Sequence, residues 1–161
     1  MNSRKVFLIT GASGFIGTAL CKSIRRSDDM LRLLVRKKIP NIDSDQFVFE
    51  NANDINQDIF VGVDVVIHLA GYAQDTKNKK SGRNMYWDVN VNLTKKILDF
   101  SVQSKVSKFV FISSVKAGGS VISDRCVNEN DQSEPKGVYG KTKREAELEL
   151  LKIGQKHNMH V

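Results

Sequence analysis

Three side chains have the types and the spacing for acid–base chemistry: Ser114, Tyr139 and Lys143. Tyr139 and Lys143 are four residues apart, so in a helix they share a face and the ammonium lies near the phenol. A free tyrosine has a pKa of about 10, and a nearby cation favours the phenolate, a usable base near neutral pH. A serine just past a strand can hydrogen-bond the same substrate hydroxyl. The spacing alone is a weak signal, and it gains weight from the motif that precedes it.

A glycine-rich segment near the start of the chain has the pattern of a phosphate-binding loop. Residues 10–17 read TGASGFIG, where an apolar strand is followed by a helix. The first glycine permits a tight turn, the second lets the backbone approach a pyrophosphate at the helix N-terminus, and the third allows close helix packing. The G-x-x-G-x-x-G spacing departs from the common dinucleotide fingerprint, so a structural turn is the alternative. The expected cofactor contacts are Gly11, Ser13, Gly14, Phe15, Ile16 and Gly17.

The ends of the second and third strands are the expected adenosine site. Dinucleotide folds usually carry an acidic residue after the second strand, whereas this chain has Arg36. A guanidinium suits a 2′-phosphate, so the cofactor is NAD or NADP with a lean toward NADP, and a surface arginine is the alternative. Asp54 can accept the adenine amino group while Ile55 packs against the ring. A lone aspartate here is equally suited to cap a helix.

The end of the fourth strand is the remaining expected cofactor contact. It reads His68, Leu69, Ala70 and Gly71, and the small residues let a cofactor lie over the strand ends. We expect His68 to be a packed strand residue rather than a catalytic group.

Hydrophobic periodicity indicates an α/β fold. Apolar runs predict strands at 6–10, 31–35, 47–49, 63–69 and 109–112. Helical spacing predicts helices over about 14–26, 88–102 and 138–157. Alternating strands and helices predict a Rossmann-like, doubly wound parallel sheet in a three-layer α/β/α arrangement. Such a fold has six strands in two halves, and only five are found, so we expect it to be incomplete at its C-terminal end.

Composition and charge exclude several classes of protein. The 161 residues are enough for one domain, and 40% are hydrophobic. The net charge of +7 is spread evenly, with 12 basic against 9 acidic residues in 1–80 and 13 against 9 in 81–161. Nucleic-acid binding is disfavoured because it requires a clustered basic patch. Apolar runs are too short for a membrane span, and the three histidines lack metal-ligand spacing. Cys21 and Cys126 are most simply reduced thiols of a cytoplasmic protein.

The chain resembles the extended short-chain dehydrogenase/reductase family, in its nucleotide-sugar epimerase, reductase and dehydratase branch. The matching segments are TGASGFIG at 10–17, DVVIHLAG at 64–71, VNVNLT at 89–94, FVFISSVK at 109–116 and YGKTKREAE at 139–147. Their order along nearly the whole chain makes the resemblance specific. The FISSVK segment is most similar to bacterial proteins of the UDP-glucose 4-epimerase and UDP-4-keto-sugar reductase kind.

The resemblance implies a role for each catalytic candidate. Tyr139 is the implied proton donor and acceptor, Lys143 tunes it and binds the nicotinamide ribose, and Ser114 orients the sugar oxygen. Dehydratases of the branch follow this serine with an Asp-Glu pair, whereas this chain has Val115 and Lys116, so dehydration is disfavoured. Glycines at 118 and 119 replace the usual Tyr-Gly or Asn-Gly, and the identity of the sugar does not carry over.

The sequence therefore predicts an NAD(P)-dependent nucleotide-sugar 4-epimerase or 4-ketoreductase. Residues 1–161 are expected to form its NAD(P)-binding Rossmann domain, ending before the sixth strand and without the C-terminal substrate domain. We expect this chain by itself to bind cofactor weakly and turn over little substrate. The expected partners are a UDP-sugar and, in a homodimer, a second copy. A catalytically idle dinucleotide-binding module, serving as a sensor or scaffold, is the alternative from another class.

Overall fold

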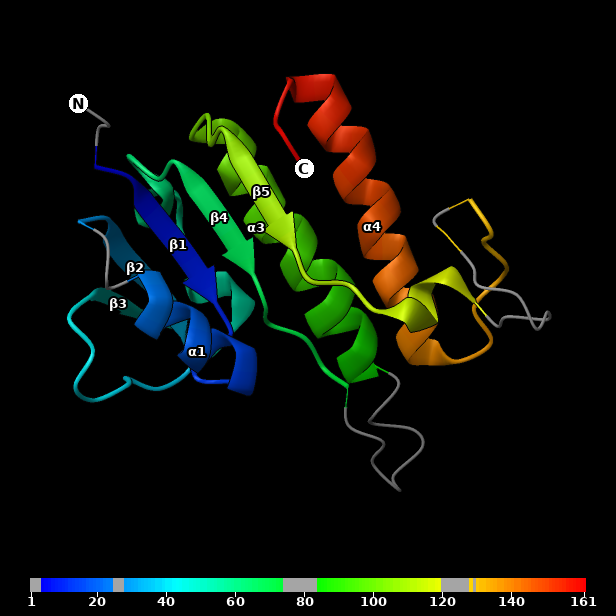
Figure 1. The fold of residues 1–161 in the computed structure, drawn as a ribbon, viewed down its shortest axis with the longest axis horizontal. Helices are drawn as coiled ribbons and strands as arrows, with labels where there is room; N and C mark the ends of the chain where they lie inside the picture. The colour runs from blue at the N-terminus through cyan, green and yellow to red at the C-terminus, as the bar shows by residue number, and fades with distance from the viewer. Residues whose placement is uncertain (1–3, 25–27, 74–83, 120–127, 129) are drawn as a thin grey trace.

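The computed structural model describes residues 4–24, 28–73, 84–119, 128 and 130–161. Its strands form one parallel sheet in the order β3-β2-β1-β4-β5 (Figure 1). This is the order of a doubly wound fold, and the prediction of five strands is confirmed for the described residues. The strands are β1 (Val6–Thr10), β2 (Met30–Val35), β3 (Asp45–Val48), β4 (Val65–His68) and β5 (Lys108–Phe111).

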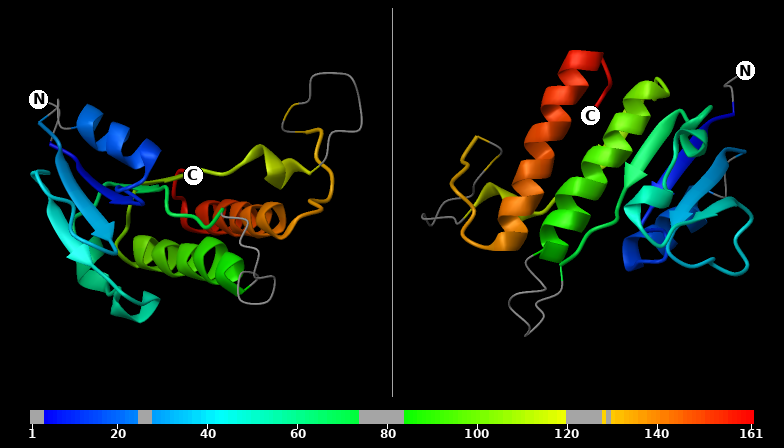
Figure 2. Two further views of the ribbon diagram at one scale, coloured as in Figure 1. Left: turned by 90° about the horizontal axis from the view of Figure 1, so that it is seen from below. Right: turned by 180° about the vertical axis from the view of Figure 1, so that it is seen from behind.

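Helices cover both faces of the sheet, which confirms the three-layer prediction (Figure 2). Helix α1 (Phe15–Ile24) lies on one face, and α3 (Leu93–Gln103) and α4 (Val138–His157) lie side by side on the other. Because all strands are parallel, their carboxyl ends meet at one edge of the sheet. The glycine-rich loop, the end of β4 and the turn after β5 are therefore neighbours at that edge.

Alternation along the strands builds the two halves of the core. In β1, Leu8 faces α3 and α4 while Ile9 faces α1, and both are fully buried. The larger cluster includes Phe109 and Ile97, and the smaller one includes Cys21. Successive strand residues point to opposite faces, so a strand that is apolar at every position must be covered on both sides.

One helix departs from the expected geometry. A regular α-helix was predicted over 88–102, but Asp88–Asn92 form a π-turn, which lies between the helical residues 84–87 and α3. Asn90 and Val91 in this turn are both buried. Such π-turns frequently occur at functional sites.

The outer edge of β5 carries one further parallel pairing. His160 forms an isolated bridge to Lys108, with the Phe109 N–H donating to the His160 carbonyl at 2.8 Å. In a doubly wound sheet the sixth strand lies at this edge, so His160 occupies the position where that strand begins. Cys21 is free and buried, and Cys126 lies outside the described residues. No helix in the described ranges is both long and apolar enough to cross a membrane.

Candidate active site

The glycine-rich loop has the tight geometry that its sequence predicts. Gly11 has a φ of +70°, and a Cβ there would lie 2.7 Å from the Ala70 nitrogen. A Cβ at Gly17 would overlap the Gly11 carbonyl oxygen and lie 2.7 Å from the Ala12 Cα. Backbone atoms cannot rotate away from such a contact. Both positions therefore require glycine, which confirms the turn at the first and the close packing at the second.

The N-terminus of α1 is open toward solvent. The helix begins at Phe15, so the N–H groups of its first turn have no carbonyl partner within the helix. The Phe15 side chain is 96% exposed and Ile16 is also exposed. These two residues can contact a phosphate only through their backbone, and the helix end is suited to an anion.

A cavity of about 500 Å³ lies over this loop, at the carboxyl ends of the strands. Its volume is in the range of ligand pockets. It is lined by the glycine-rich loop, the end of β2, residues 49–52 and the segment after β4. The site residues predicted from sequence that line it are Gly11, Ser13, Gly14, Arg36, Leu69, Ala70 and Gly71.

The cavity fits a dinucleotide. The glycine-rich loop leaves room for the pyrophosphate, because only the Gly11 oxygen at 3.3 Å would meet a Cβ at Gly14. Leu34, Val35 and Phe49 supply apolar surface for an adenine ring, and Arg36 lines the cavity directly after β2.

Two predicted adenine contacts do not line the cavity. The Asp54 carboxylate accepts the backbone N–H groups of Glu50 and Asn51 at 3.0 and 2.8 Å, and these bonds lower its pKa. Asp54 thus takes the capping role that was the alternative to adenine binding. Ile55 is buried in the core cluster beneath α3. The lining at this point comes from Glu50 and Asn51, whose position directly after β3 was the available signal.

Lys143 lies buried at the carboxyl end of β5. Its side chain is one helical turn beyond Tyr139, only 4% of its surface is exposed, and Nζ donates to the Ile112 carbonyl at 2.6 Å. Nζ also lies 3.8 Å from the centre of the Phe111 ring. Burial lowers the pKa of Lys143 to about 8, against a smaller opposing effect of Glu147. The amine is therefore mostly protonated at neutral pH and close to its titration range.

Ser114 begins the short turn that packs against the start of α4. Its Oγ accepts the Lys116 N–H at 3.3 Å, at the head of η4 (Val115–Gly118). A Cβ at Gly140 would overlap the Lys116 carbonyl oxygen, so glycine lets this turn lie directly on the helix that carries Tyr139. The preceding hydroxyl, Ser113 Oγ, is buried and has no hydrogen-bond partner within the described part of the chain. A buried hydroxyl without a partner is costly, so this spot favours a bound polar group.

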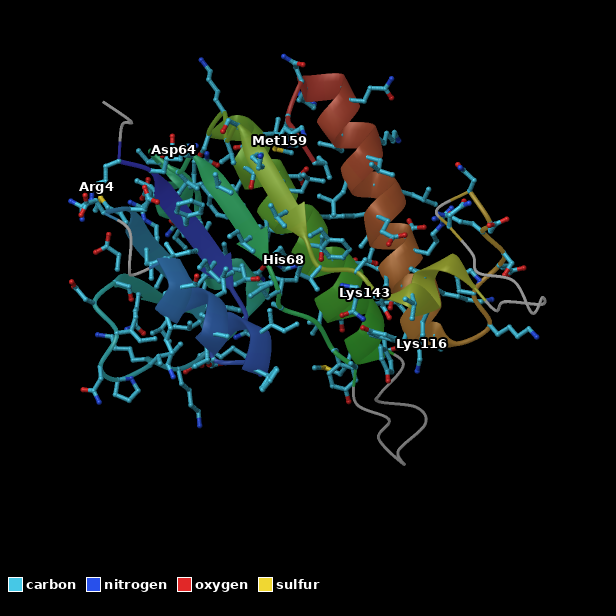
Figure 3. The ribbon with its side chains drawn as sticks, in the orientation of Figure 1. Arg4, Asp64, His68, Lys116, Lys143 and Met159 are labelled. Carbon is cyan, nitrogen blue, oxygen red and sulfur yellow. The ribbon has the colours of Figure 1, made fainter. Side chains whose placement is uncertain are left out.

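Aromatic rings connect the cavity to Tyr139. Tyr72, which lines the cavity, packs edge-on against Tyr86 at 4.9 Å between ring centres, and Tyr86 lies 6.2 Å from Tyr139. The Lys116 ammonium is 5.9 Å from the Tyr139 ring on the side of η4 (Figure 3). Tyr139 is half-buried within this group. The structure thus brings the predicted cofactor loop and the predicted catalytic helix to the two sides of one site.

Asn90, which sequence reasoning missed, joins the same two sides. Its amide oxygen accepts the Tyr72 N–H at 2.7 Å, and its amide nitrogen donates to the Tyr72 carbonyl at 3.0 Å and to Thr142 Oγ1 at 3.1 Å. Thr142 in turn donates to the Tyr139 carbonyl. The available signal was a polar residue on the apolar face of a predicted helix.

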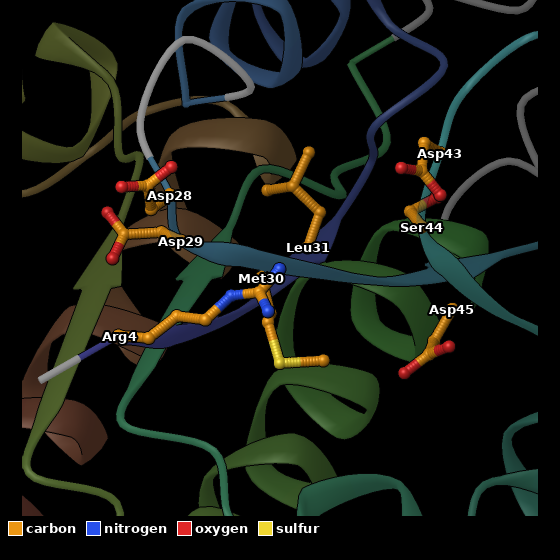
Figure 4. A pocket seen from close by; sticks show the side chains of 8 residues that line it. All are labelled: Arg4, Asp28, Asp29, Met30, Leu31, Asp43, Ser44 and Asp45. Atoms are coloured by element: carbon orange, nitrogen blue, oxygen red, sulfur yellow. The ribbon is translucent and has the colours of Figure 1, made fainter.

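A second cavity lies at the opposite end of the sheet and carries no such arrangement. It has a volume of about 550 Å³ and surrounds Arg4 with the carboxylates of Asp28, Asp29, Asp43 and Asp45 (Figure 4). These residues lie at or before the amino ends of β2 and β3. Within the described ranges, no three histidine, cysteine or acidic side chains are grouped closely enough to hold a metal ion. Ligands of open α/β sheets bind at the other edge.

Comparison with known proteins agrees with this placement. Residues 7–161 match the model of the NAD dependent epimerase/dehydratase family. The chain is 33% identical over 165 aligned positions to the UDP-glucose 4-epimerase of Vibrio cholerae, covering 98% of this chain and 49% of that protein.

Solved structures show the same fold. MoeE5 in complex with UDP-glucose and NAD superposes with a TM-score of 0.83 at 27% identity, over 95% of this chain and 50% of that one. MoeE5 in complex with UDP-glucuronic acid and NAD gives 0.81 at 29% identity, over 92% and 49%. The chain spans about half the length of these relatives. With the glycine-rich cradle, the strand-end cavity and the family match in agreement, the chain belongs to the NAD-dependent epimerase/dehydratase family.

Proposed function

We propose that this chain carries the cofactor-binding and proton-transferring part of an NAD(P)-dependent nucleotide-sugar 4-epimerase or 4-ketoreductase. The observation that supports it most directly is the position of α4. Tyr139 and Lys143 stand beside the turn that begins at Ser114, and the Tyr72 and Tyr86 rings link them to the cofactor cavity. Oxidising or reducing one sugar carbon requires a hydride site and a proton site next to each other.

The chain's own residues handle the proton. When bound, the nicotinamide cofactor supplies a hydride acceptor or donor. Tyr139 accepts the proton of the C4 hydroxyl, and Ser114 holds the same oxygen by a hydrogen bond. The protonated Lys143 amine favours the phenolate of Tyr139. In a 4-epimerase Tyr139 accepts the proton and later returns it, whereas in a 4-ketoreductase it only donates it.

The dehydratase alternative finds no support next to Ser114. Eliminating water requires an acid and a base near the reacting carbons, and the positions after the serine hold Val115, with an exposed apolar side chain, and Lys116. The Lys116 ammonium lies over the Tyr139 ring. A cation there matches proton transfer at Tyr139 and leaves no carboxylate at this position.

The substrate class rests on the relatives. The Vibrio cholerae relative is a UDP-glucose 4-epimerase, and MoeE5 binds UDP-glucose and UDP-glucuronic acid together with NAD. We therefore propose a UDP-sugar as substrate. Arg36 in the cavity lining supports NADP as an alternative cofactor to NAD.

A homodimer in the cytoplasm completes the proposal. Leu148 and Leu151, one turn apart on α4, are 49% and 59% exposed and offer an apolar strip to a second copy. Cys21 agrees with a reducing compartment, because it is a free thiol. Sedimentation velocity of the wild type and of Leu151→Glu tests the dimer: a wild-type dimer that the glutamate dissociates supports it, and a wild-type monomer contradicts it.

The experiment for the activity separates binding from chemistry. A longer protein that contains residues 1–161 together with a substrate domain is titrated with NAD⁺ and NADP⁺ by calorimetry and then incubated with UDP-glucose, UDP-galactose and UDP-glucuronic acid. Tyr139→Phe should reduce turnover at least about 100-fold while changing cofactor affinity less than about threefold. Tyr86→Phe, which keeps its ring beside Tyr139, is the matched control and should retain turnover. Full turnover by Tyr139→Phe contradicts the mechanism. Cofactor binding without turnover of any UDP-sugar favours the idle binding module.

A further inference from the structure

His68 is fully buried at the end of β4, and both of its ring nitrogens make hydrogen bonds (Figure 3). Nδ1 lies 2.6 Å from Thr10 Oγ1 on β1, and Nε2 lies 2.9 Å from Thr94 Oγ1 on α3. The ring stacks on Phe111 with 5.8 Å between centres. The role assigned above to Tyr139 makes no use of this histidine, although it lies one residue before the loop that lines the cofactor cavity.

The hydrogen-bond partners determine where the ring proton lies. Thr94 Oγ1 donates its single proton to the Asn90 carbonyl at 2.9 Å, so toward His68 it can only accept. Nε2 must therefore carry the proton and donate it to Thr94. A neutral ring then has a bare Nδ1, which accepts the proton of Thr10 Oγ1.

The surroundings keep the ring neutral. Burial, and after it the nearby charge of Lys143, lowers the pKa of His68 to about 3. The aromatic side chains that pack against it are Phe109 and Phe111. Across the working pH range of an intracellular enzyme the ring is therefore a fixed donor on one side and a fixed acceptor on the other.

The Thr10 hydroxyl connects the His68 ring to the segment that lines the cofactor cavity. Because the Thr10 hydroxyl gives its proton to His68, its lone pairs face the Ala70 N–H, which donates to it at 3.1 Å. The Leu69 N–H already donates to the Thr10 carbonyl at 3.2 Å, so the side chain extends the β1–β4 pairing by one residue. Ala70 is also the residue against which Gly11 is pressed.

We propose that His68 is a positioning residue for cofactor binding: in its Nε2–H form it orients the Thr10 hydroxyl, which holds Ala70 against the glycine-rich loop. The proposal rests on the cofactor cavity described above and is independent of which sugar is transformed. The other side of the same loop is held by Asn90 through both backbone groups of Tyr72. The loop is thus held at two points, and His68 controls the one nearest the phosphate cradle.

Two substitutions of His68 each retain one of the two hydrogen bonds that the ring makes. In His68→Asn the side-chain oxygen takes the place of Nδ1 and can accept from Thr10, whereas in His68→Gln the side-chain nitrogen takes the place of Nε2 and can donate to Thr94. We expect His68→Asn to keep NAD⁺ affinity within about threefold of the wild type and His68→Gln to lose at least about tenfold. Equal losses in both variants overturn the proposal.

Substitutions at Thr10 test the same proposal even if the histidine variants fail to fold. Thr10→Val keeps the shape and removes the hydroxyl, and it should weaken NAD⁺ binding about tenfold and speed hydrogen exchange of the Ala70 amide. Thr10→Ser restores the hydroxyl and should restore both. Ser101→Ala removes an equally buried hydroxyl from α3, where it bonds only the Ile97 carbonyl, and should change neither. An Ala70 amide that exchanges at the wild-type rate in Thr10→Val overturns the proposal.

Nitrogen-15 spectra of the wild-type protein without cofactor give the direct reading. The expected spectrum has a protonated Nε2 and a bare Nδ1 for His68, unchanged between pH 8 and pH 5. A protonated Nδ1 overturns the assignment. If the spectrum and the exchange rates are as expected but no variant changes NAD⁺ affinity, the link exists but does not position cofactor, and the proposal fails. Absence of any NAD⁺ binding by the wild type, by contrast, contradicts the proposed function.

Discussion

The two sides of the site are held together by different forces. The glycine-rich loop is shaped by missing side chains, since Gly11 and Gly17 bring backbone onto backbone. The catalytic side is shaped by buried polar side chains, with Asn90, Thr142 and Lys143 hydrogen-bonded across α3, α4 and the end of β5. The first side fails when an atom is added, and the second when one is removed. Steric and polar constraints therefore predict opposite kinds of damaging substitution on the two sides of one site.

The largest effect is expected from adding one methyl group to the glycine side. Gly17→Ala should lower the free energy of unfolding by about 3 kcal/mol, because the new Cβ meets the backbone of Gly11 and Ala12. Urea denaturation measures it. Gly14→Ala is the control, with its nearest atom at 3.3 Å, and should cost less than about 1 kcal/mol. Equal losses would mean that α1 moves freely away from β1.

The corresponding test on the catalytic side, called the polar side below, removes a buried polar side chain. Asn90→Ala leaves the half-buried backbone of Tyr72 and the buried Thr142 hydroxyl without this partner, and should lower the free energy of unfolding by about 2 to 3 kcal/mol. Asn92→Ala, two residues away on the exposed side, loses one bond to Asp88 and should cost under about 0.5 kcal/mol. If Asn90→Ala had the same free energy of unfolding as the wild type, packing alone would hold the two sides together.

Titration of Lys143 tests how firmly the polar side is buried. Its pKa is about 8 in the folded protein and near its ordinary 10.5 in the unfolded chain, so the unfolded chain binds more protons between these values. The penalty for burying the charge is complete below pH 8 and is relieved as the pH rises toward 10.5. The wild type should therefore gain on the order of 2 kcal/mol relative to Lys143→Met between pH 8 and pH 10. The stability difference between the two proteins, measured by denaturation at each pH, should stay flat below pH 7.

The same series with Lys141→Met controls for loss of a positive charge on α4. Lys141 is exposed and paired with Glu134. The difference in the free energy of unfolding between the wild type and Lys141→Met should not change with pH as it does for Lys143→Met. If the stability difference between the wild type and Lys143→Met did not change with pH, the Lys143 amine would be exposed to water in the folded protein.

The smallest effect is expected at the rim of the glycine side, where Arg36 lines the cavity but is exposed. Arg36→Ala should weaken NADP⁺ binding about tenfold and leave NAD⁺ binding within about twofold, because only the 2′-phosphate gains from the guanidinium. Paired calorimetric titrations measure it, with Lys37→Ala as the control. Equal losses for both dinucleotides would mean that Arg36 does not distinguish the ribose.

Local geometry explains which predictions were confirmed. The turn at Gly11 and the packing at Gly17 each depend on a strand, a turn and a helix that are adjacent in sequence. Asp54 and Ile55 were predicted to contact the adenine, but the structure does not place them in the cavity lining. The short turn Ala52–Asp54 points the carboxylate back to its own backbone and directs the next side chain into the core.

The polar side could not be derived in the same way. The hydrogen bond between Asn90 and Thr142 joins residues 52 positions apart in the sequence, and the one between Thr10 and His68 joins residues 58 positions apart. A pattern of local spacing therefore cannot predict either bond. His68 was expected only to pack in its strand, which its burial confirms, but the form of its ring proton follows from partners on two other elements.

By itself the sequence determined the parallel α/β fold, the glycine-rich turn and the presence of Ser114, Tyr139 and Lys143, because strand alternation and helical spacing are local properties. Only the tertiary structure decided which side chains line the cavity, which carboxylate caps a turn, and where the proton of His68 lies. These outcomes depend on the directions in which side chains from distant segments meet, and local spacing does not determine those directions.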